Sequence, residues 1–310
     1  MAKKRMLITG GLGFIGSNLI KQLDLDKYQV TVLDNLTNTA QSGVESIVDV
    51  IEGDIRNEND VAQATANQNV VVHLAAHTRV IDSIEDPALN FDINVRGTFN
   101  VLEGMRKNGV MTIVNASTGG AILGEVEPPV HEEIAANPAA PYGASKLAAE
   151  GYCSAYSQSY GMQALSLRFS NIYGRYSRNK GSVVAAFIKS IVKNGSITIY
   201  GDGTQIRDYL FVDDLARGIV QAIESGVSGV YQLGSGIPTD LNSLVELMRS
   251  ALPHEFKVVH EDFRAGELRQ TFCNIDKAAK AFGFSPTTKL PEGIRATWNW
   301  FKEEGLDHHK

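Results

Sequence analysis

The residues with the clearest chemistry are a tyrosine and a lysine in the segment PYGASKLAAEGY (141–152). Proline at the start of a helical pattern predicts a helix here, and Tyr142 and Lys146 are four residues apart, so they share one helix face. A nearby ammonium favours the phenolate and brings tyrosine, whose ordinary pKa is about 10, towards use as a base. The same spacing also occurs on ordinary helix faces, so the pair needs support from its surroundings.

Two hydroxyl groups form the second candidate. The stretch ASTGG (116–120) places Ser117 and Thr118 directly after the apolar run VMTIVN (110–115). A hydroxyl beside a tyrosine base can hydrogen-bond and polarise a substrate oxygen. We predict that Thr118 supplies this hydroxyl, with Ser117 as the alternative.

The elements that must position these residues alternate along the first half of the chain. Apolar runs occur at 5–10, 29–35, 47–54, 69–76 and 110–117, and segments such as 14–23 and 87–109 between them have apolar spacings of three and four. Continuous apolar strands that alternate with helices predict an α/β fold, a Rossmann-like doubly wound parallel sheet. Ligands bind beyond the carboxyl ends of such strands, where ASTGG would lie.

A dinucleotide site is indicated by TGGLGFIG (9–16), between a strand and a helix. Gly10 permits the tight turn, Gly13 lets a phosphate approach the backbone, and Gly16 allows close helix packing. Asp34, 18 residues beyond Gly16, suits both ribose hydroxyls and repels a 2′-phosphate, which favours NAD over NADP; a turn residue is the alternative. Asp54 either meets the adenine edge or caps a local turn.

The pattern changes after residue 171, so we expect two domains. Residues 1–172 would form the NAD-binding domain, to which the segment of about 208–230 returns. Residues 173–310 would mainly form a smaller, interleaved α/β domain for the substrate.

Composition excludes two broad classes of partner. Lys and Arg number 29 against 35 Asp and Glu, a formal net charge of −6, so we expect no nucleic-acid partner. No segment approaches the ~18 apolar residues of a membrane span. The two cysteines are too few for a disulfide framework. We expect a cytoplasmic protein with no membrane partner.

Taken together, the motifs resemble the extended short-chain dehydrogenase/reductases of the NAD-dependent nucleotide-sugar epimerase/dehydratase family, and within it the UDP-galactose (UDP-N-acetylglucosamine) 4-epimerase-like enzymes. The segments that carry the resemblance span nearly the whole chain and are TGGLGFIGSNL, VTVLDNLTN, GDI, VVHLAAHT, NVRGTFNVLE, PYGASK, LRFSNIYG, ITIYGDGTQIRDYLFVDDLARGI and RAGEL.

The resemblance implies contacts for a cofactor and a nucleotide sugar. The implied NAD contacts are Gly10, Gly13, Phe14, Ile15, Gly16, Asp34, Asn35, Asp54, Ile55, Leu74, Ala75, Ala76, Tyr142 and Lys146. The implied substrate contacts are Arg79, Thr118, Asn171, Gly181, Ser182, Val183, Arg207, Arg264, Glu267 and Thr271. Among them, Arg207 and Arg264 would hold the diphosphate, although salt bridges to Asp208 or Glu267 are an alternative.

The activity that the resemblance implies is 4-epimerisation of a UDP-hexose through a transient 4-keto intermediate. Tyr142 would take the proton of the 4-OH group while hydride passes from C4 to NAD. A nucleotide-sugar dehydratase or decarboxylase needs acids directly after the catalytic hydroxyl, and Gly119, Gly120 and Ala121 stand there instead. A non-catalytic NAD-binding regulator is the alternative of another class, which the presence of Tyr142 and Lys146 disfavours.

Sugar specificity, assembly and metal binding complete the expectations. A small side chain at Thr271 leaves room for a 2-acetamido group, so we expect tolerance of UDP-GlcNAc and UDP-GalNAc or of derivatives such as uronates. Arg79, Arg175 or Arg178 could meet a uronate carboxylate, and simple solvent-exposed arginines are the alternative. The helices at 87–108 and 142–160 favour a homodimer through a four-helix interface. We expect no metal, because His73 and His77 lack a second cluster of ligands.

Overall fold

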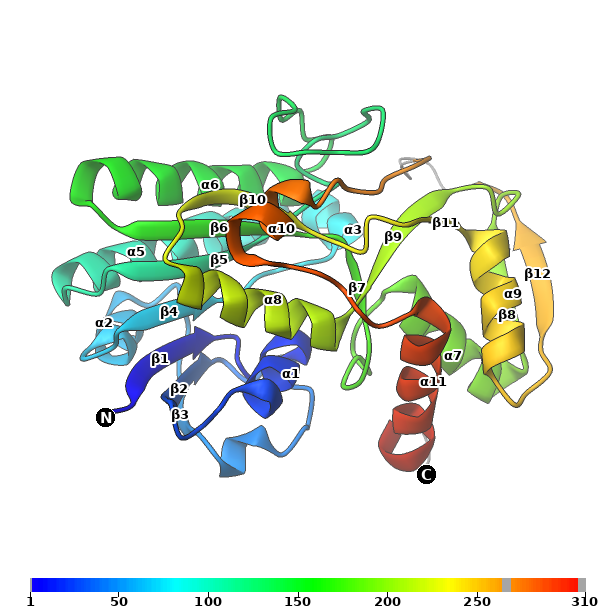
Figure 1. Ribbon diagram of the computed structural model, residues 1–310, viewed down its shortest axis with the longest axis horizontal. Coiled ribbons are helices and arrows are strands. Elements are labelled where there is room, and N and C mark those ends of the chain that lie inside the picture. The colour runs from blue at the N-terminus through cyan, green and yellow to red at the C-terminus, as the bar shows by residue number, and fades with distance from the viewer. Residues whose placement is uncertain (1, 264–268, 306–310) are drawn as a thin grey trace.

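The computed structural model describes residues 2–263 and 269–305. Its main sheet has seven strands in the order β10-β6-β5-β4-β1-β2-β3, and every neighbouring pair is parallel. The strands are β1 (Lys4–Thr9), β2 (Tyr28–Asp34), β3 (Asp49–Glu52), β4 (Val70–His73), β5 (Thr112–Thr118), β6 (Gln163–Phe169) and β10 (Gly229–Leu233). The predicted Rossmann-like α/β fold is confirmed (Figure 1).

Both faces of this sheet are covered by helices, which explains the continuous apolar strands in the sequence. Along β1, Met6 and Ile8 belong to the core on one face and Leu7 to the core on the other. The first face packs against α1 (Phe14–Gln22) and α8 (Val212–Ser225). The second packs against α2 (Glu58–Thr65), α5 (Gly97–Lys107) and α6 (Pro141–Tyr160) (Figure 1).

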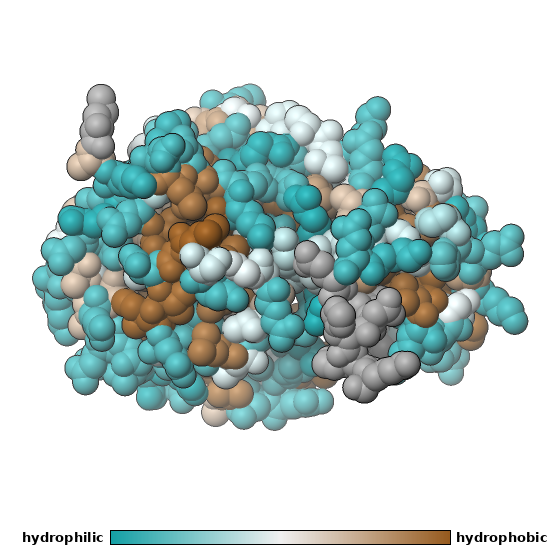
Figure 2. Space-filling view, turned by 90° about the horizontal axis from the view of Figure 1, so that it is seen from below, coloured by the Kyte–Doolittle hydropathy of each residue, from teal (hydrophilic) through white to brown (hydrophobic). Residues whose placement is uncertain are grey.

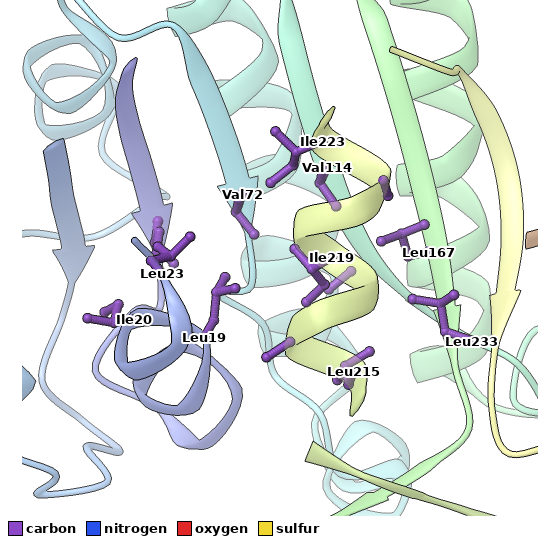
Figure 3. Packing of buried hydrophobic residues seen from close by; sticks show 14 of the residues in the cluster. Leu19, Ile20, Leu23, Val72, Val114, Leu167, Leu215, Ile219, Ile223 and Leu233 are labelled. Atoms are coloured by element: carbon purple, nitrogen blue, oxygen red, sulfur yellow. The ribbon is translucent and has the colours of Figure 1, made fainter. Parts of the chain in front are cut away.

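The core under α1 and α8 is shown in Figure 3. Leucine and isoleucine side chains of both helices converge on Val72, Val114 and Leu167 of the central strands. Each such side chain contributes roughly 1.5–3 kcal/mol on full burial. Apolar packing of this kind holds the carboxyl ends of β1, β4 and β5 at one edge, where the predicted site residues lie.

The helical segment predicted at 87–109 is interrupted in the structure. It consists of α4 (Pro87–Phe91), one π-helical turn η2 (Asp92–Arg96) and α5, and is preceded by α3 (Val80–Glu85). The π turn carries Asn94, whose side chain bonds to the main chain of His77. Apolar periodicity alone cannot reveal such a turn, because one inserted residue barely changes the pattern.

The remaining elements form the smaller, later part of the chain. They include a three-stranded sheet of β7 (Asn171–Tyr173), β9 (Ile206–Phe211) and β11 (Pro238–Asp240), and a parallel pair of β8 (Ser196–Tyr200) and β12 (Lys257–Glu261). Of the other helical segments, η1 (Val44–Ser46) and α10 (Asp276–Phe282) pack into the core of the main sheet. The second core is formed with α7 (Val183–Asn194), α9 (Leu241–Ala251), α11 (Leu290–Trp300) and η3 (Phe301–Gly305). Because α8 and β10 lie on the main sheet, the chain crosses between its two parts several times (Figure 1). The domain boundary near residue 172 stays a prediction.

The surface seen from below Figure 1 is mostly hydrophilic, and apolar residues gather mainly towards the left, under the part that carries the main sheet (Figure 2). Within the described residues, none of the helices is both long and apolar enough to cross a membrane.

Candidate active site

The predicted catalytic pair lies at the start of α6, against the end of β5. Lys146 Nζ donates to the carbonyl oxygen of Ala116, 2.9 Å away. A side-chain carbon at Gly143 would collide with the carbonyl oxygen of Ala121, so only glycine lets the helix come this close. The first turn of α6 therefore sits directly on the loop that follows β5, and Tyr142 and Lys146 face that loop.

The two candidate hydroxyls point to different partners. The Thr118 hydroxyl lies close enough to the phenol of Tyr142 to act on its pKa, which it lowers. Ser117, the preceding residue of β5, donates to Glu150 Oε1 at 2.6 Å and is only 4% exposed. Both partners belong to α6, Tyr142 in its first turn and Glu150 about two turns further along, so the two hydroxyls meet different parts of the same helix. The geometry brings Thr118, not Ser117, to Tyr142.

A buried ion pair explains where Ser117 goes. Arg168 on β6 makes two hydrogen bonds to Glu150 on α6, of 2.9 and 2.8 Å. Both side chains are at most 6% exposed. Removing one partner of such a pair costs several kcal/mol, roughly 3–5, because the other charge stays buried. This pair ties α6 to the sheet one turn beyond Lys146, and sequence analysis missed it.

Burial shifts the pKa of both catalytic candidates. Burial raises the pKa of Tyr142 to about 12, although the Thr118 hydroxyl acts in the opposite direction. Burial also lowers the pKa of Lys146 to about 8, against the raising effects of Cys153 and Glu150. Each shift disfavours the charged form of its group, so a phenolate here depends on a compensating positive charge close by.

The glycine-rich turn between β1 and α1 has the geometry that a dinucleotide requires. Gly10 has a φ of +67°, and a Cβ there would lie 2.8 Å from the backbone of Ala75. A Cβ on Gly16 would lie 2.5 Å from the Cα of Gly11. Gly13 begins α1 without a side-chain cap, so the amino end of the helix is open to an anion. These features fit the diphosphate of NAD.

Asp34 lies at the end of β2, beside this turn. Its carboxylate accepts hydrogen bonds from the backbone N–H groups of Leu12 and Leu36, both at 3.0 Å. Burial raises the pKa of Asp34, and these two bonds oppose the rise. A carboxylate has about four lone-pair sites, so two backbone bonds leave capacity for the hydroxyls of a ribose.

Asp54 has a local role in the structure. It receives two hydrogen bonds from the Arg56 guanidinium, of 2.9 and 2.7 Å, one from the Arg56 backbone, and one from Asn35. These partners lower its pKa to about 2. The turn-stabilising role that the sequence left open is therefore present, and the adenine contact stays a prediction.

The segment after β4 lines the same edge of the sheet. The N–H of Leu74 donates to the Thr9 carbonyl at 3.0 Å, and the backbone of Ala75 lies against Gly10. The contacts predicted for Ala76 and Ile55 stay predictions. His73 is buried between the hydroxyls of Thr9 and Thr98, at 2.7 and 3.0 Å, and burial lowers its pKa to about 3.

His73 is thus a neutral residue of the core. Across the described residues there is no cluster of three or more His, Cys, Asp or Glu side chains that could hold a metal ion.

Of the predicted substrate residues, Thr271 lies beside the loop that follows β5, whereas Asn171 and residues 181–183 lie on β7 and at the start of α7. Thr271 lies at the catalytic loop, because a Cβ on Gly120 would be 3.1 Å from its hydroxyl oxygen. Asn171 donates to the carbonyl of Asp208 at 3.2 Å, and Gly181, Ser182 and Val183 lead into α7.

The predicted arginines are not assembled at one place by the described residues. Arg207 Nη1 donates to the Ile206 carbonyl at 2.8 Å. Arg79 lies at the surface, 68% exposed, and pairs with Asp82 at 3.4 Å. Arg264 and Glu267 lie outside the described residues.

Two further residues support the start of α6 and were missed from the sequence. Ser83 on α3 accepts from the backbone N–H of Tyr142 at 3.1 Å. Asn94 donates to Ser145 Oγ at 2.9 Å, and Ser145 in turn donates to the Tyr142 carbonyl at 2.8 Å. Single polar residues in helical segments give no signal that they will meet a residue some 50 positions away.

A family model and a relative of known sequence both match this chain over most of its length. The family model described as "NAD dependent epimerase/dehydratase family" matches residues 6–234. A UDP-glucose 4-epimerase of Mycolicibacterium smegmatis is 30% identical over 314 residues, 97% of this chain and 99% of that protein.

Solved structures agree. The Thermus thermophilus UDP-glucose 4-epimerase complex with NAD superimposes with a TM-score of 0.89 at 35% identity, over 97% of this chain and 99% of that one. The UDP-N-acetylglucosamine 4-epimerase of Methanobrevibacter ruminantium, in complex with UDP-N-acetylmuramic acid, gives 0.91 at 28% identity over the same shares. This chain therefore belongs to the NAD-dependent epimerase/dehydratase family.

Proposed function

We propose that this protein is an NAD-dependent UDP-sugar 4-epimerase. The observation that carries the proposal is the contact of Thr118 with Tyr142, one helical turn from Lys146, at the sheet edge that also carries the glycine-rich turn. The relatives named as UDP-glucose 4-epimerases match this chain over almost its whole length, which supports the same reaction here.

In the proposed reaction, residues of the chain remove one proton from the sugar O4 and later return it. Tyr142 takes the proton from the 4-hydroxyl, and Thr118 hydrogen-bonds the same oxygen as it becomes a carbonyl. Lys146 supplies the positive charge that the buried phenol needs in order to ionise. NAD, when bound, supplies reversible hydride acceptance at C4. After the keto sugar has turned, Tyr142 returns the proton to O4 as C4 regains hydride on its opposite face, and this gives the C4 epimer.

The loop after Thr118 disfavours the rival reactions of the same fold. Gly119 packs against Gln232 and Gly120 against Thr271, and neither position has room for a larger side chain without displacing its neighbour. An acid directly after the catalytic hydroxyl, which a dehydratase would use, is absent from this loop, and an acid placed there would have to displace Gln232 or Thr271.

We also propose that the sugar pocket accepts a 2-acetamido group. Thr271, which packs against the catalytic loop, is small, and its neighbour Gly120 adds no side chain to the pocket. The UDP-N-acetylglucosamine 4-epimerase among the structural relatives makes this class of substrate a natural one to test. Uronates are the second candidate class.

We infer that a second copy of the chain covers the outer face of α5 and α6. Phe99 and Tyr152, 39% and 40% exposed, form an edge-to-face pair across these helices, with centroids 5.8 Å apart. Ile84 and Phe91 on α3 and α4 are 60% and 53% exposed on neighbouring elements. Such apolar side chains on adjacent helices are typical of protein interfaces.

Sedimentation equilibrium should give twice the 33.6 kDa mass of one chain. Phe99→Glu should shift the mass to that of a monomer, because it places a charge in the apolar interface. Val192→Glu, a change at a similarly exposed position on α7, is the control. A monomeric wild type would contradict the interface.

Incubation of the purified protein with UDP-glucose, UDP-GlcNAc and UDP-glucuronate, followed by NMR, tests the reaction. We expect C4 epimers with no net reduction of NAD. A 4-keto-6-deoxy product or a pentose would show a dehydratase or a decarboxylase. Bound NAD without turnover of any sugar, unchanged in Tyr142→Phe, would show a regulator.

Thr271→Tyr tests the acetamido pocket. The bulky ring should lower the ratio of kcat/KM for UDP-GlcNAc to that for UDP-glucose by at least about tenfold, since a steric clash of ~1.4 kcal/mol or more suffices for this factor. Thr271→Ser, which stays small, should leave the ratio close to wild type. Absence of UDP-GlcNAc conversion in the wild type, with UDP-glucose converted, would contradict the pocket.

Thr118→Ala and Ser117→Ala should have different effects. Loss of the Thr118 hydroxyl should lower kcat by about 10²–10³-fold, the usual effect of removing one donor to a developing oxyanion. Loss of the Ser117 hydroxyl should mainly lower the free energy of unfolding, by about 1.5–3 kcal/mol, because Glu150 loses a hydrogen bond. Thr118→Ser should retain most activity. Equal, mild losses of kcat in both alanine variants would contradict the assignment.

The pKa of Lys146 predicts a pH dependence of stability. Between pH 8 and 10.5 the lysine holds its proton in the unfolded chain and loses it in the folded one. The free energy of unfolding should therefore rise with pH in this window, by up to about 1.4 kcal/mol per unit. Urea unfolding without NAD should show this rise in the difference between wild type and Lys146→Met. A difference that is flat from pH 8 to 10.5 would contradict the shifted pKa.

A further inference from the structure

The segment Gly174–Lys180, here called the crossing loop, reaches from β7 to the nucleotide-binding part of the chain. Asn18 on α1, only 2% exposed, donates to the carbonyl oxygens of Phe14 and Arg175, at 2.8 and 2.9 Å. Asn179 donates to the Thr39 carbonyl at 3.1 Å. The crossing loop is thus bound both to α1 and to the segment that follows β2.

Lys180 ends the crossing loop over the first residue of α1. Its Nζ lies 5.5 Å from the centroid of the Phe14 ring, within the range of a cation–π contact. Its backbone is fixed from two sides, because its N–H donates to the Ser177 carbonyl at 2.9 Å and its carbonyl accepts from Lys189 at 3.2 Å. The ammonium is therefore held beside the amino end of α1 by the backbone of the loop.

No acidic side chain among the described residues, 2–263 and 269–305, pairs with the Lys180 ammonium, and burial lowers the pKa of this lysine to about 8. The amino end of α1 carries the positive end of the helix dipole, and Gly13 gives it no side-chain cap. Two positive features thus lie beside the first residue of α1, and neither is paired with an acidic side chain among the described residues, which favours an anion there.

We propose that Lys180 is a ligand of the cofactor diphosphate, so that the crossing loop from the substrate-binding part closes over the NAD that the glycine-rich turn binds. The diphosphate would accept hydrogen bonds from backbone N–H groups of α1 on one side and from the Lys180 ammonium on the other. The Phe14 ring lies beside the ammonium itself. The inference concerns the cofactor of the proposed reaction and rests on it.

This arrangement has a consequence for the exchange of NAD. The cofactor cannot leave the turn without separation of Lys180 from its diphosphate or displacement of the loop from Asn18 and Thr39. A cofactor that is regenerated in each turnover gains from such retention, and the loop supplies it without contacting the reacting atoms.

Isothermal titration of the NAD-free protein with NAD, ADP-ribose, adenosine and UDP tests the assignment without turnover. Lys180→Met should weaken the binding of NAD and of ADP-ribose by about ten- to a hundredfold. This is the usual effect on affinity of losing one hydrogen bond to a charged group. Adenosine and UDP should bind as to wild type. Lys180→Arg should keep most of the affinity for NAD, and Lys193→Met, at an exposed lysine near the end of α7, should bind all four as wild type does.

Three outcomes would overturn the proposal. Unchanged affinity of Lys180→Met for ADP-ribose would show that the ammonium does not touch the diphosphate. If Lys180→Met lost affinity for adenosine as much as for ADP-ribose, the loop would have a merely structural role. A loss for UDP in place of ADP-ribose would assign the lysine to the substrate diphosphate. Because only binding is measured, a failure of the proposed epimerisation leaves each of these results interpretable.

Discussion

The close approach of α6 to the end of β5 is the contact on which the site depends. It requires a glycine at position 143, against the carbonyl of Ala121, and it is held by the hydrogen bond from Lys146 to Ala116. One turn further along α6, the buried pair of Glu150 and Arg168 fixes the helix to the sheet. A looser contact would separate Tyr142 from Thr118 and Lys146 from the Ala116 carbonyl. The geometry of the candidate site therefore depends directly on the packing of α6 against β5.

Much of this could be predicted from the sequence, because it rests on local rules. The alternation of apolar strands and helices predicted the parallel sheet, and the glycines at 10, 13 and 16 predicted the tight turn at the start of α1. Proline 141 marked the start of α6. These features depend on residues that are neighbours along the chain, or on a pattern that repeats with a fixed period.

What the sequence could not predict depends on contacts between distant residues. The two hydroxyls of ASTGG are equivalent by type, and only the strand register, with Ser117 opposite Arg168, sends Ser117 to Glu150. Asp54 was open between two roles because nothing local shows that Arg56 folds back onto it. The attachment of the crossing loop to Asn18 joins residues 157 positions apart, which no local pattern shows.

The glycines of ASTGG follow from the same long-range contacts. Gly120 is small because Thr271 occupies the adjacent space, and the segment that carries Thr271 is fixed in turn, since its N–H donates to the Ile206 carbonyl at 3.0 Å. Two residues on, Cys273 donates to the fully buried Asp208, and this carboxylate and burial keep the pKa of the thiol well above its ordinary value, so it stays a donor. Position 271 is therefore set by the core of the later part of the chain. The space beside the loop that follows β5 is consequently shaped by both parts of the chain, and a larger side chain at Gly119 or Gly120 would meet Gln232 or Thr271.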